Sequence, residues 1–193
     1  MDRSALCDEC KMFHVEHFDE GCFDIGNICK VYGAFDYADG PRNVVFRFKY
    51  EGKRMLARQM AELIFQRVGE IGSCGDFLVP VPLHKGRERE RGFNQAGLLA
   101  TGLSILTGLP AYDGLMRRRE TMRQFELSAD ERKANVSGAF ELKEGFDVSG
   151  ADVLLVDDIL TTGATARECA SVLKHAGARS VKLIVFAIAV MEI

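Results

Sequence analysis

The sequence predicts an α/β domain built on a twisted, mostly parallel sheet flanked by helices, with a small cysteine-rich segment before it. Apolar runs that suit buried strands alternate with helical patterns from about residue 31 onward. This alternation is typical of a parallel sheet covered on both faces. Residues 1–30 instead hold four of the six cysteines and two of the four histidines, with almost no apolar periodicity. We therefore divide the chain into a segment of residues 1–30 and a domain of residues 31–193.

The first half of the domain gives two strands and two helices. Lys30–Tyr37 alternates apolar and polar residues, which predicts a strand, and the turn signal Asp39-Gly40-Pro41 closes it. Helices are expected over Arg42–Tyr50 and over Lys53–Val68, where apolar residues recur every three or four positions. Phe77–Leu83 is a short apolar run that suits a buried strand. Its two prolines indicate that it ends at a sheet edge or in a loop.

The second half continues the same alternation. Phe93–Leu106 has the pattern of a helix that ends before Gly108 and Pro110. Val153–Val156 is a second apolar strand, and a helix over Ala164–Ala176 follows it, ended by Gly177. Val181–Val190 predicts the last strand.

The composition is that of an ordinary globular protein, with 47% hydrophobic and 27% charged residues and a net charge of −3. These values argue against disorder and give no overall bias towards nucleic acid. The first residues are polar, so no signal peptide is expected. The longest apolar run, Val181–Val190, contains Lys182 and is too short for a membrane helix. We expect a cytoplasmic protein without membrane insertion, whose cysteines stay reduced.

The segment Val153–Thr165 (VLLVDDILTTGAT) carries the chemistry. Ligands of open α/β sheets bind at the carboxyl ends of the strands, where this segment places two carboxylates and a turn rich in hydroxyl groups. Backbone N–H groups around Gly163, with the start of the next helix, suit a phosphate. Asp157 and Asp158 can accept hydrogen bonds from a ribose diol and stabilise positive charge on the sugar. Mg²⁺ would suit the oxygens of such a ligand.

A simpler interpretation is a solvated strand end followed by a helix cap, which we would prefer for an isolated pair of aspartates or threonines. The whole arrangement favours function, since every local signal points to one place. Other nucleotide sites lack their motifs: no G-x-G-x-x-G follows a strand, and no G-x-x-x-x-G-K-[ST] occurs.

The segment resembles the 5-phosphoribosyl-1-pyrophosphate (PRPP) signature of type I phosphoribosyltransferases. Two further blocks, Val81–Ala96 (VPLHKGRERERGFNQA) and Thr121–Phe140 (TMRQFELSADERKANVSGAF), are similar to the ComF family, which includes GntX-type proteins and is linked to DNA uptake. The resemblance implies a type I phosphoribosyltransferase fold in which Asp157 and Asp158 hold the ribose hydroxyls. The residues that it implies for the 5′-phosphate are Thr161, Thr162, Gly163, Ala164 and Thr165.

Two basic blocks add further candidates. Type I enzymes carry a pyrophosphate loop at the position of Lys85 and Arg87, so these two residues join the aspartates as candidate catalytic residues. Arg89 and Arg91 alternate with glutamates and equally suit a solvated helix start.

Residues 117–134 are charged, with little apolar character, and predict an exposed loop. The resemblance implies a flexible loop that closes over the substrate, with candidates Arg118, Arg119, Thr121 and Gln124. A further use of both blocks is contact with single-stranded DNA, with Phe93 and Phe125 available for stacking on bases. Each phenylalanine is more often a core residue.

The cysteine-rich segment predicts a structural zinc site. Cys7-x-x-Cys10 is half of a zinc knuckle, Cys22 is a third ligand, and His17 completes the tetrahedral set that we favour. His14 and Cys29 are alternatives for the fourth ligand. A degenerate ribbon without metal remains the other interpretation, because one clean pair is a weaker signal than two.

Three functions follow from these observations. The first is an enzyme that transfers phosphoribose from PRPP to an unknown acceptor and releases pyrophosphate. The second is a module that senses PRPP or a related nucleotide without turning it over. The third is an accessory factor for DNA uptake that binds single strands and contacts a helicase. The sequence does not fix the acceptor or the oligomeric state, for which a dimer is plausible.

Overall fold

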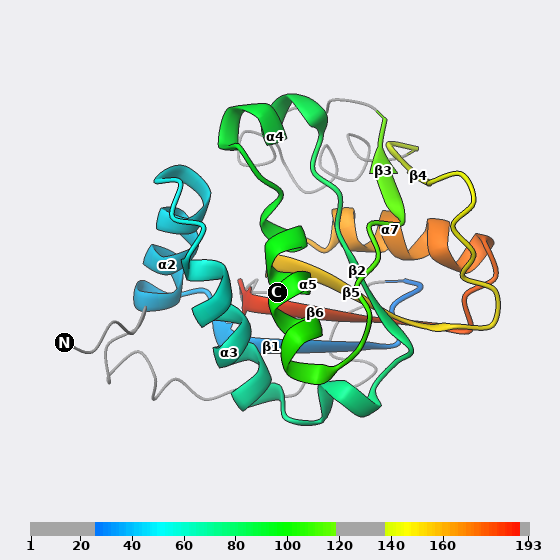
Figure 1. Ribbon diagram of the computed structural model, residues 1–193, viewed down its shortest axis with the longest axis horizontal. Helices are drawn as coiled ribbons and strands as arrows, with labels where there is room; N and C mark the ends of the chain where they lie inside the picture. The colour runs from blue at the N-terminus through cyan, green and yellow to red at the C-terminus, as the bar shows by residue number, and fades with distance from the viewer. Residues whose placement is uncertain (1–25, 119–137, 190–193) are drawn as a thin grey trace.

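The computed structural model describes residues 26–118 and 138–189, and its centre is a parallel sheet (Figure 1). The strands lie in the order β1-β6-β5-β2, and all neighbours are parallel. This arrangement confirms the expected fold class. The strands are β1 (Lys30–Asp36), β6 (Ser180–Ile188), β5 (Asp152–Leu160) and β2 (Phe77–Pro80).

Helices cover both faces of this sheet (Figure 1). One face packs against the helices that follow β1 and β2, and the other against the helix between β5 and β6. The helices are α2 (Asp39–Tyr50), α3 (Leu56–Val68), the 3₁₀ helix η1 (Glu70–Ser73), α4 (Lys85–Arg91), α5 (Gln95–Thr107) and α7 (Ala164–His175).

Strand β5 shows how the core is divided. Its side chains alternate between the two faces of the sheet, as in any strand. Leu154 and Val156 pack with α3 and α5, while Val153 and Leu155 pack with α7. All four are fully buried, which explains why the run reads as continuously apolar.

Several elements differ from the sequence prediction. Asp39-Gly40-Pro41 does not form a turn but the first turn of α2, where a proline is tolerated because the first N–H groups of a helix have no intrahelical partner. Strand β5 runs on through the two aspartates to Leu160 instead of ending at Val156, since it stays paired with β6. A small antiparallel pair was not predicted, formed by β3 (Leu115–Arg117) and β4 (Phe140–Leu142).

The basic block Lys85–Arg91 is a short helix, α4, and not a loop. His84 caps its start through Nδ1, which accepts a hydrogen bond from the Gly86 N–H at 3.2 Å. Gly92 ends it in the left-handed conformation, with φ of 78°. Among the helices in the described parts of the chain, none has the length and apolar character needed to cross a membrane.

Candidate functional site

A pocket of about 410 Å³ opens where β2 stops and β5 continues. The last paired residue of β2 is Pro80, opposite Val156, and the chain then leaves the sheet through Pro82 towards α4. Proline has no N–H to extend the ladder. Residues 157–160 of β5 therefore have β6 on one side and the pocket on the other. The carboxyl edge of the sheet is thus the ligand-sized opening that the sequence predicted.

The turn after β5 forms one end of this pocket. Thr161, Thr162, Gly163, Ala164 and Thr165 all line it, as the sequence predicted. Gly163 has φ of 72°, a left-handed conformation that suits glycine, and α7 begins at the next residue. The start of α7 thus lies at the pocket, and a helix start with its unpaired N–H groups and positive dipole end is the arrangement that binds phosphate groups.

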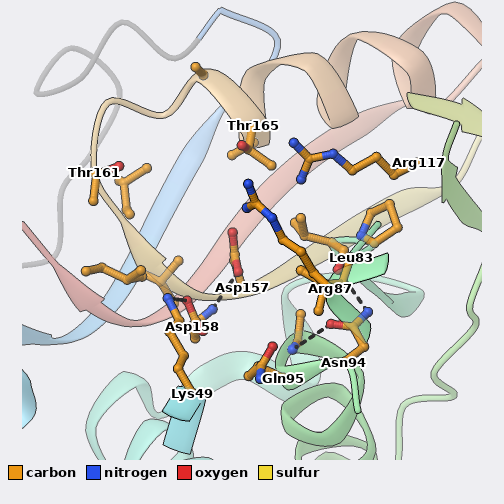
Figure 2. A pocket seen from close by; sticks show the side chains of 18 of the residues that line it. Lys49, Leu83, Arg87, Asn94, Gln95, Arg117, Asp157, Asp158, Thr161 and Thr165 are labelled. Carbon is orange, nitrogen blue, oxygen red and sulfur yellow. Dashed lines mark hydrogen bonds and ion pairs between the residues drawn. The ribbon is translucent and has the colours of Figure 1, made fainter. Parts of the chain in front are cut away.

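The two carboxylates lie on opposite faces of β5, because the strand continues through them (Figure 2). Asp158 faces α2 and is 4% exposed. Its Oδ1 lies 2.8 Å from Nζ of Lys49, with which it forms an ion pair. Asp157 faces α7 and is half-buried. Its Oδ1 accepts a hydrogen bond from the Asp158 N–H at 2.8 Å. Both line the pocket, but each has its own neighbours.

Asp157 is the residue whose protonation is perturbed. Burial, and after it the negative charge of Asp158, raise the pKa of its carboxyl from the ordinary 3.8 to about 7. The positive charges of Lys49 and Arg117 oppose this rise in the pKa. The negatively charged form of Asp157 is therefore destabilised relative to the protonated form. A cation or a hydroxyl donor in the pocket would favour the charged form.

Arginines approach the carboxylates from above the sheet. Figure 2 shows Arg87 of α4 and Arg117 of β3 pointing towards Asp157 and Thr165, and both line the pocket. Arg117 is buried, and its guanidinium lies over the Phe140 ring, 5.1 Å from the ring centre. These two guanidinium groups are suited to bind the anionic oxygens of a phosphate or pyrophosphate.

Other predicted site residues are not brought to this pocket. Lys85 is exposed and lines a separate hollow of about 520 Å³ between α4, α5 and β3. Arg118 is paired with Glu141 and does not line the pocket. Phe93 is 6% exposed and packs on Phe48, so the expectation that it stacks on bases is wrong.

Several predictions lie outside the described residues. These are the zinc ligands Cys7, Cys10, His17 and Cys22, the loop residues Arg119, Thr121 and Gln124, and Phe125. Within residues 26–118 and 138–189, no three side chains of His, Cys, Asp or Glu gather into a metal-binding group.

Sequence reasoning missed residues that complete the pocket. Lys49, the partner of Asp158, comes from the last turn of α2. Arg91, for which the sequence equally suggested a solvated helix start, lies over the ring of Tyr50, 5.3 Å from its centre, and donates to Gln95 Oε1 at 3.1 Å. Gln95 begins α5 and is 3% exposed. No local pattern marks Lys49 or Gln95, because only the packing of α2 and α5 brings them to the pocket.

Comparison with known proteins agrees with this geometry. The family model of the phosphoribosyl transferase domain matches residues 91–190. Competence protein F of Haemophilus influenzae is 32% identical over 149 residues, which cover 72% of this chain and 64% of that protein. DNA utilization protein YhgH of Salmonella typhimurium is 36% identical over 155 residues, covering 77% and 67%. Competence protein ComFC of Bacillus subtilis is 32% identical over 144 residues, covering 74% and 57%.

The matches thus span about two thirds or less of these relatives' own length. Among solved structures, adenine phosphoribosyltransferase from Leishmania donovani is 14% identical, with a TM-score of 0.44 over 74% of this chain and 68% of that one. A TM-score below 0.5 adds nothing to the assignment, which rests on the family model and the relatives. The chain belongs to the phosphoribosyl transferase domain family and, within it, to the group of competence protein F, ComFC and YhgH.

Proposed function

We propose that the pocket binds PRPP together with Mg²⁺ and that the protein transfers phosphoribose to an acceptor with release of pyrophosphate. One observation carries this proposal: a phosphate-binding turn, two carboxylates and Arg87 line the same pocket at the carboxyl edge of the sheet. In this arrangement Thr161–Thr165 hold the 5′-phosphate, the carboxylates hold the ribose hydroxyls, and Arg87 binds phosphate oxygens of the ligand.

The proposed reaction breaks the bond between ribose C1 and the pyrophosphate oxygen. Pyrophosphate leaves with the bonding electron pair, and the acceptor's nucleophilic atom forms the new bond to C1 and gives up its proton to solvent. Asp157 and Asp158 stabilise the positive charge that develops on the sugar ring, and Arg87 stabilises the negative charge on the leaving group. When bound, Mg²⁺ would neutralise the pyrophosphate, with ligand oxygens and carboxylates as its natural donors.

The relatives' names suggest the biological setting. Because they are named for competence and DNA utilization, we propose that this activity serves the handling of incoming DNA in the cytoplasm. The acceptor would then be a molecule that this process supplies or modifies. A module that senses PRPP without turnover would bind the same ligand but release no pyrophosphate.

Calorimetric titration with PRPP, with and without Mg²⁺, tests the binding. Wild type should bind, while Asp157→Asn and Arg87→Ala should each bind at least about tenfold more weakly, a loss of about 1.4 kcal/mol. Arg89→Ala is the matched control, because Arg89 is an exposed arginine of α4 that does not line the pocket. Absence of binding at millimolar PRPP would refute the proposal. Pyrophosphate release with a panel of acceptors then separates an enzyme from a sensor.

Single-stranded DNA is a second candidate ligand, and one surface feature favours it. Phe46 and Tyr50 are 54% and 59% exposed on α2, their rings lie 5.1 Å apart, and Arg91 covers Tyr50. Exposed rings beside arginines suit stacking with unpaired bases and contact with their phosphates. Oligonucleotide binding should weaken with salt and in the variant Phe46→Ala. If both leave it unchanged, this second function fails. In this second function, the protein would also contact a helicase that acts on the same single strand.

We also propose that the segment of residues 1–30 binds structural zinc through Cys7, Cys10, His17 and Cys22. The spacing of the cysteines supports this ligand set. Purified protein should contain about one zinc ion per chain, and Cys7→Ser should lose it. Zinc-free protein that folds equally well would contradict the proposal.

A further inference from the structure

The side-chain amide of Gln95 is a buried hydrogen-bond donor that the protein itself does not use. Gln95 is 3% exposed and lines the pocket from the first turn of α5. Within the described parts of the chain, its Nε2 is buried and has no acceptor. A buried donor without an acceptor destabilises the folded protein, so it calls for an explanation such as a bound ligand.

The orientation of this amide is fixed by its neighbour. Arg91 Nη1 lies 3.1 Å from Gln95 Oε1. An arginine can only donate, so the atom facing it must be the amide oxygen, and the NH₂ group must face the other way. Stacking on Tyr50 holds the same guanidinium in place. The amide therefore cannot turn to satisfy its donor without losing this contact.

The adjacent Asn94 shows the contrast. Its Nδ2 donates to the Val81 carbonyl at 3.1 Å, and its Oδ1 accepts from the Ala96 N–H at 3.1 Å. Asn94 thus caps α5 and ties it to the chain after β2, with both ends of its amide engaged. Gln95 lies in the same pocket wall with only its oxygen engaged.

The position of Gln95 identifies the kind of ligand group. It lies on the side of β5 that carries Asp158 and Lys49 (Figure 2), away from the phosphate turn. Asp158 only accepts hydrogen bonds, and the Gln95 NH₂ only donates them. A sugar hydroxyl can do both. A phosphate oxygen would accept from Gln95 but has no proton to donate to the Asp158 carboxylate, so it could not join the two groups.

We propose that Gln95 is a ligand-binding residue whose NH₂ group donates to a ribose hydroxyl that in turn donates to Asp158. This inference rests on the proposed PRPP function. It adds a residue that binds the sugar of the ligand and not its phosphates. Gln95 would then favour pentose phosphates with free hydroxyls over other anions that enter the pocket.

The test compares ribose 5-phosphate with inorganic pyrophosphate on three full-length variants. Gln95→Met keeps the size of the side chain but removes both polar groups. Gln95→Glu keeps an oxygen for Arg91 and removes the donor, but it also adds a negative charge that should weaken the binding of every anion, so Gln95→Met is the variant that compares the two ligands. Gln66→Met makes the same change at an exposed position of α3 outside the pocket and is the matched control.

We expect both Gln95 variants to bind ribose 5-phosphate about tenfold more weakly or worse. Gln95→Met should in addition bind pyrophosphate as wild type does and melt no lower than wild type. The unchanged melting point distinguishes a ligand-binding role from a structural one. Wild-type affinity for ribose 5-phosphate in both Gln95 variants, or an equal loss for both ligands in Gln95→Met, would overturn the inference. Failure of wild type to bind PRPP with Mg²⁺ would instead remove the proposed function itself.

Discussion

Replacing Asp157 by asparagine should stabilise the ligand-free protein, and increasingly so as the pH rises. The carboxyl of Asp157 has a pKa raised to about 7, first by burial and then by the charge of Asp158. Asparagine has nearly the same shape and keeps the Oδ1 that accepts from the Asp158 N–H. The substitution therefore removes little except the buried negative charge.

The sign and the size follow from the pKa. A carboxyl whose folded pKa lies above its unfolded value contributes stability that is fully present below about pH 3.8 and is lost as the pH rises through about 7. A difference of about three pH units corresponds to at most about 4 kcal/mol. Because Asp157 is only half-buried and water screens part of its charge, we expect Asp157→Asn to gain about 1–2 kcal/mol at pH 8 and almost nothing at pH 4.

Urea denaturation without ligand or Mg²⁺ at both pH values measures this difference. Glu144→Gln is the control, because it removes an exposed carboxyl outside the pocket and should show no comparable gain at pH 8. An Asp157→Asn protein that is less stable than wild type at pH 8, or equally shifted at both pH values, would refute the reasoning. The stabilised variant should also lose affinity for PRPP, as expected where a strained group serves binding.

Three further substitutions test the surroundings of the site and the sheet. Lys49→Met leaves the buried carboxylate of Asp158 without its charged partner. Urea denaturation at pH 7 should therefore show a free energy of unfolding lower by about 2–3 kcal/mol, and a decrease below about 0.5 kcal/mol would contradict this. Gly163→Ala puts a Cβ at φ of 72° and should cost about 1 kcal/mol in the same assay and weaken phosphate binding; an unchanged affinity would argue against the turn as the phosphate site. Arg179→Ala should let the pKa of Asp152 rise from about 2 towards its ordinary value. Stability would then fall by up to about 1 kcal/mol above pH 4 and be unaffected below pH 2, and acid titration followed by circular dichroism would show an unchanged midpoint if the pair were irrelevant.

The fold was predictable where each element carries its own signal. The buried strands β5 and β6 are apolar runs, and α3 has the periodicity of a half-buried helix. Strands β3 and β4 have three residues each, too few for a period to appear. The end of β5 could not be predicted from the sequence either, because the strand continues through Asp157 and Asp158 only by pairing with β6.

The basic block shows why part of the site was assigned wrongly to a loop. On a loop, Lys85 and Arg87 could both reach a ligand. On the helix α4, residues two apart point in different directions, while residues three and four apart share a face. Arg87, Glu90 and Arg91 accordingly line the pocket, and Lys85 lines the neighbouring hollow. The same sequence thus places a different set of side chains in the pocket when it forms a helix than when it forms a loop.

The continuation of β5 through the two aspartates also changes what they can do. Two acids on a flexible turn could bind one group together, whereas alternation on a strand gives each its own surroundings. Asp158 meets the ammonium of Lys49 and shares its face with Gln95, while Asp157 lies towards α7, with the charge of Arg117 acting on it. Asp158 therefore has a fixed counter-charge before any ligand arrives, and Asp157 is the acid whose charge a ligand must stabilise. On this argument, ligand binding near pH 7 should release a proton from Asp157, and the two acids should not be interchangeable in mutation.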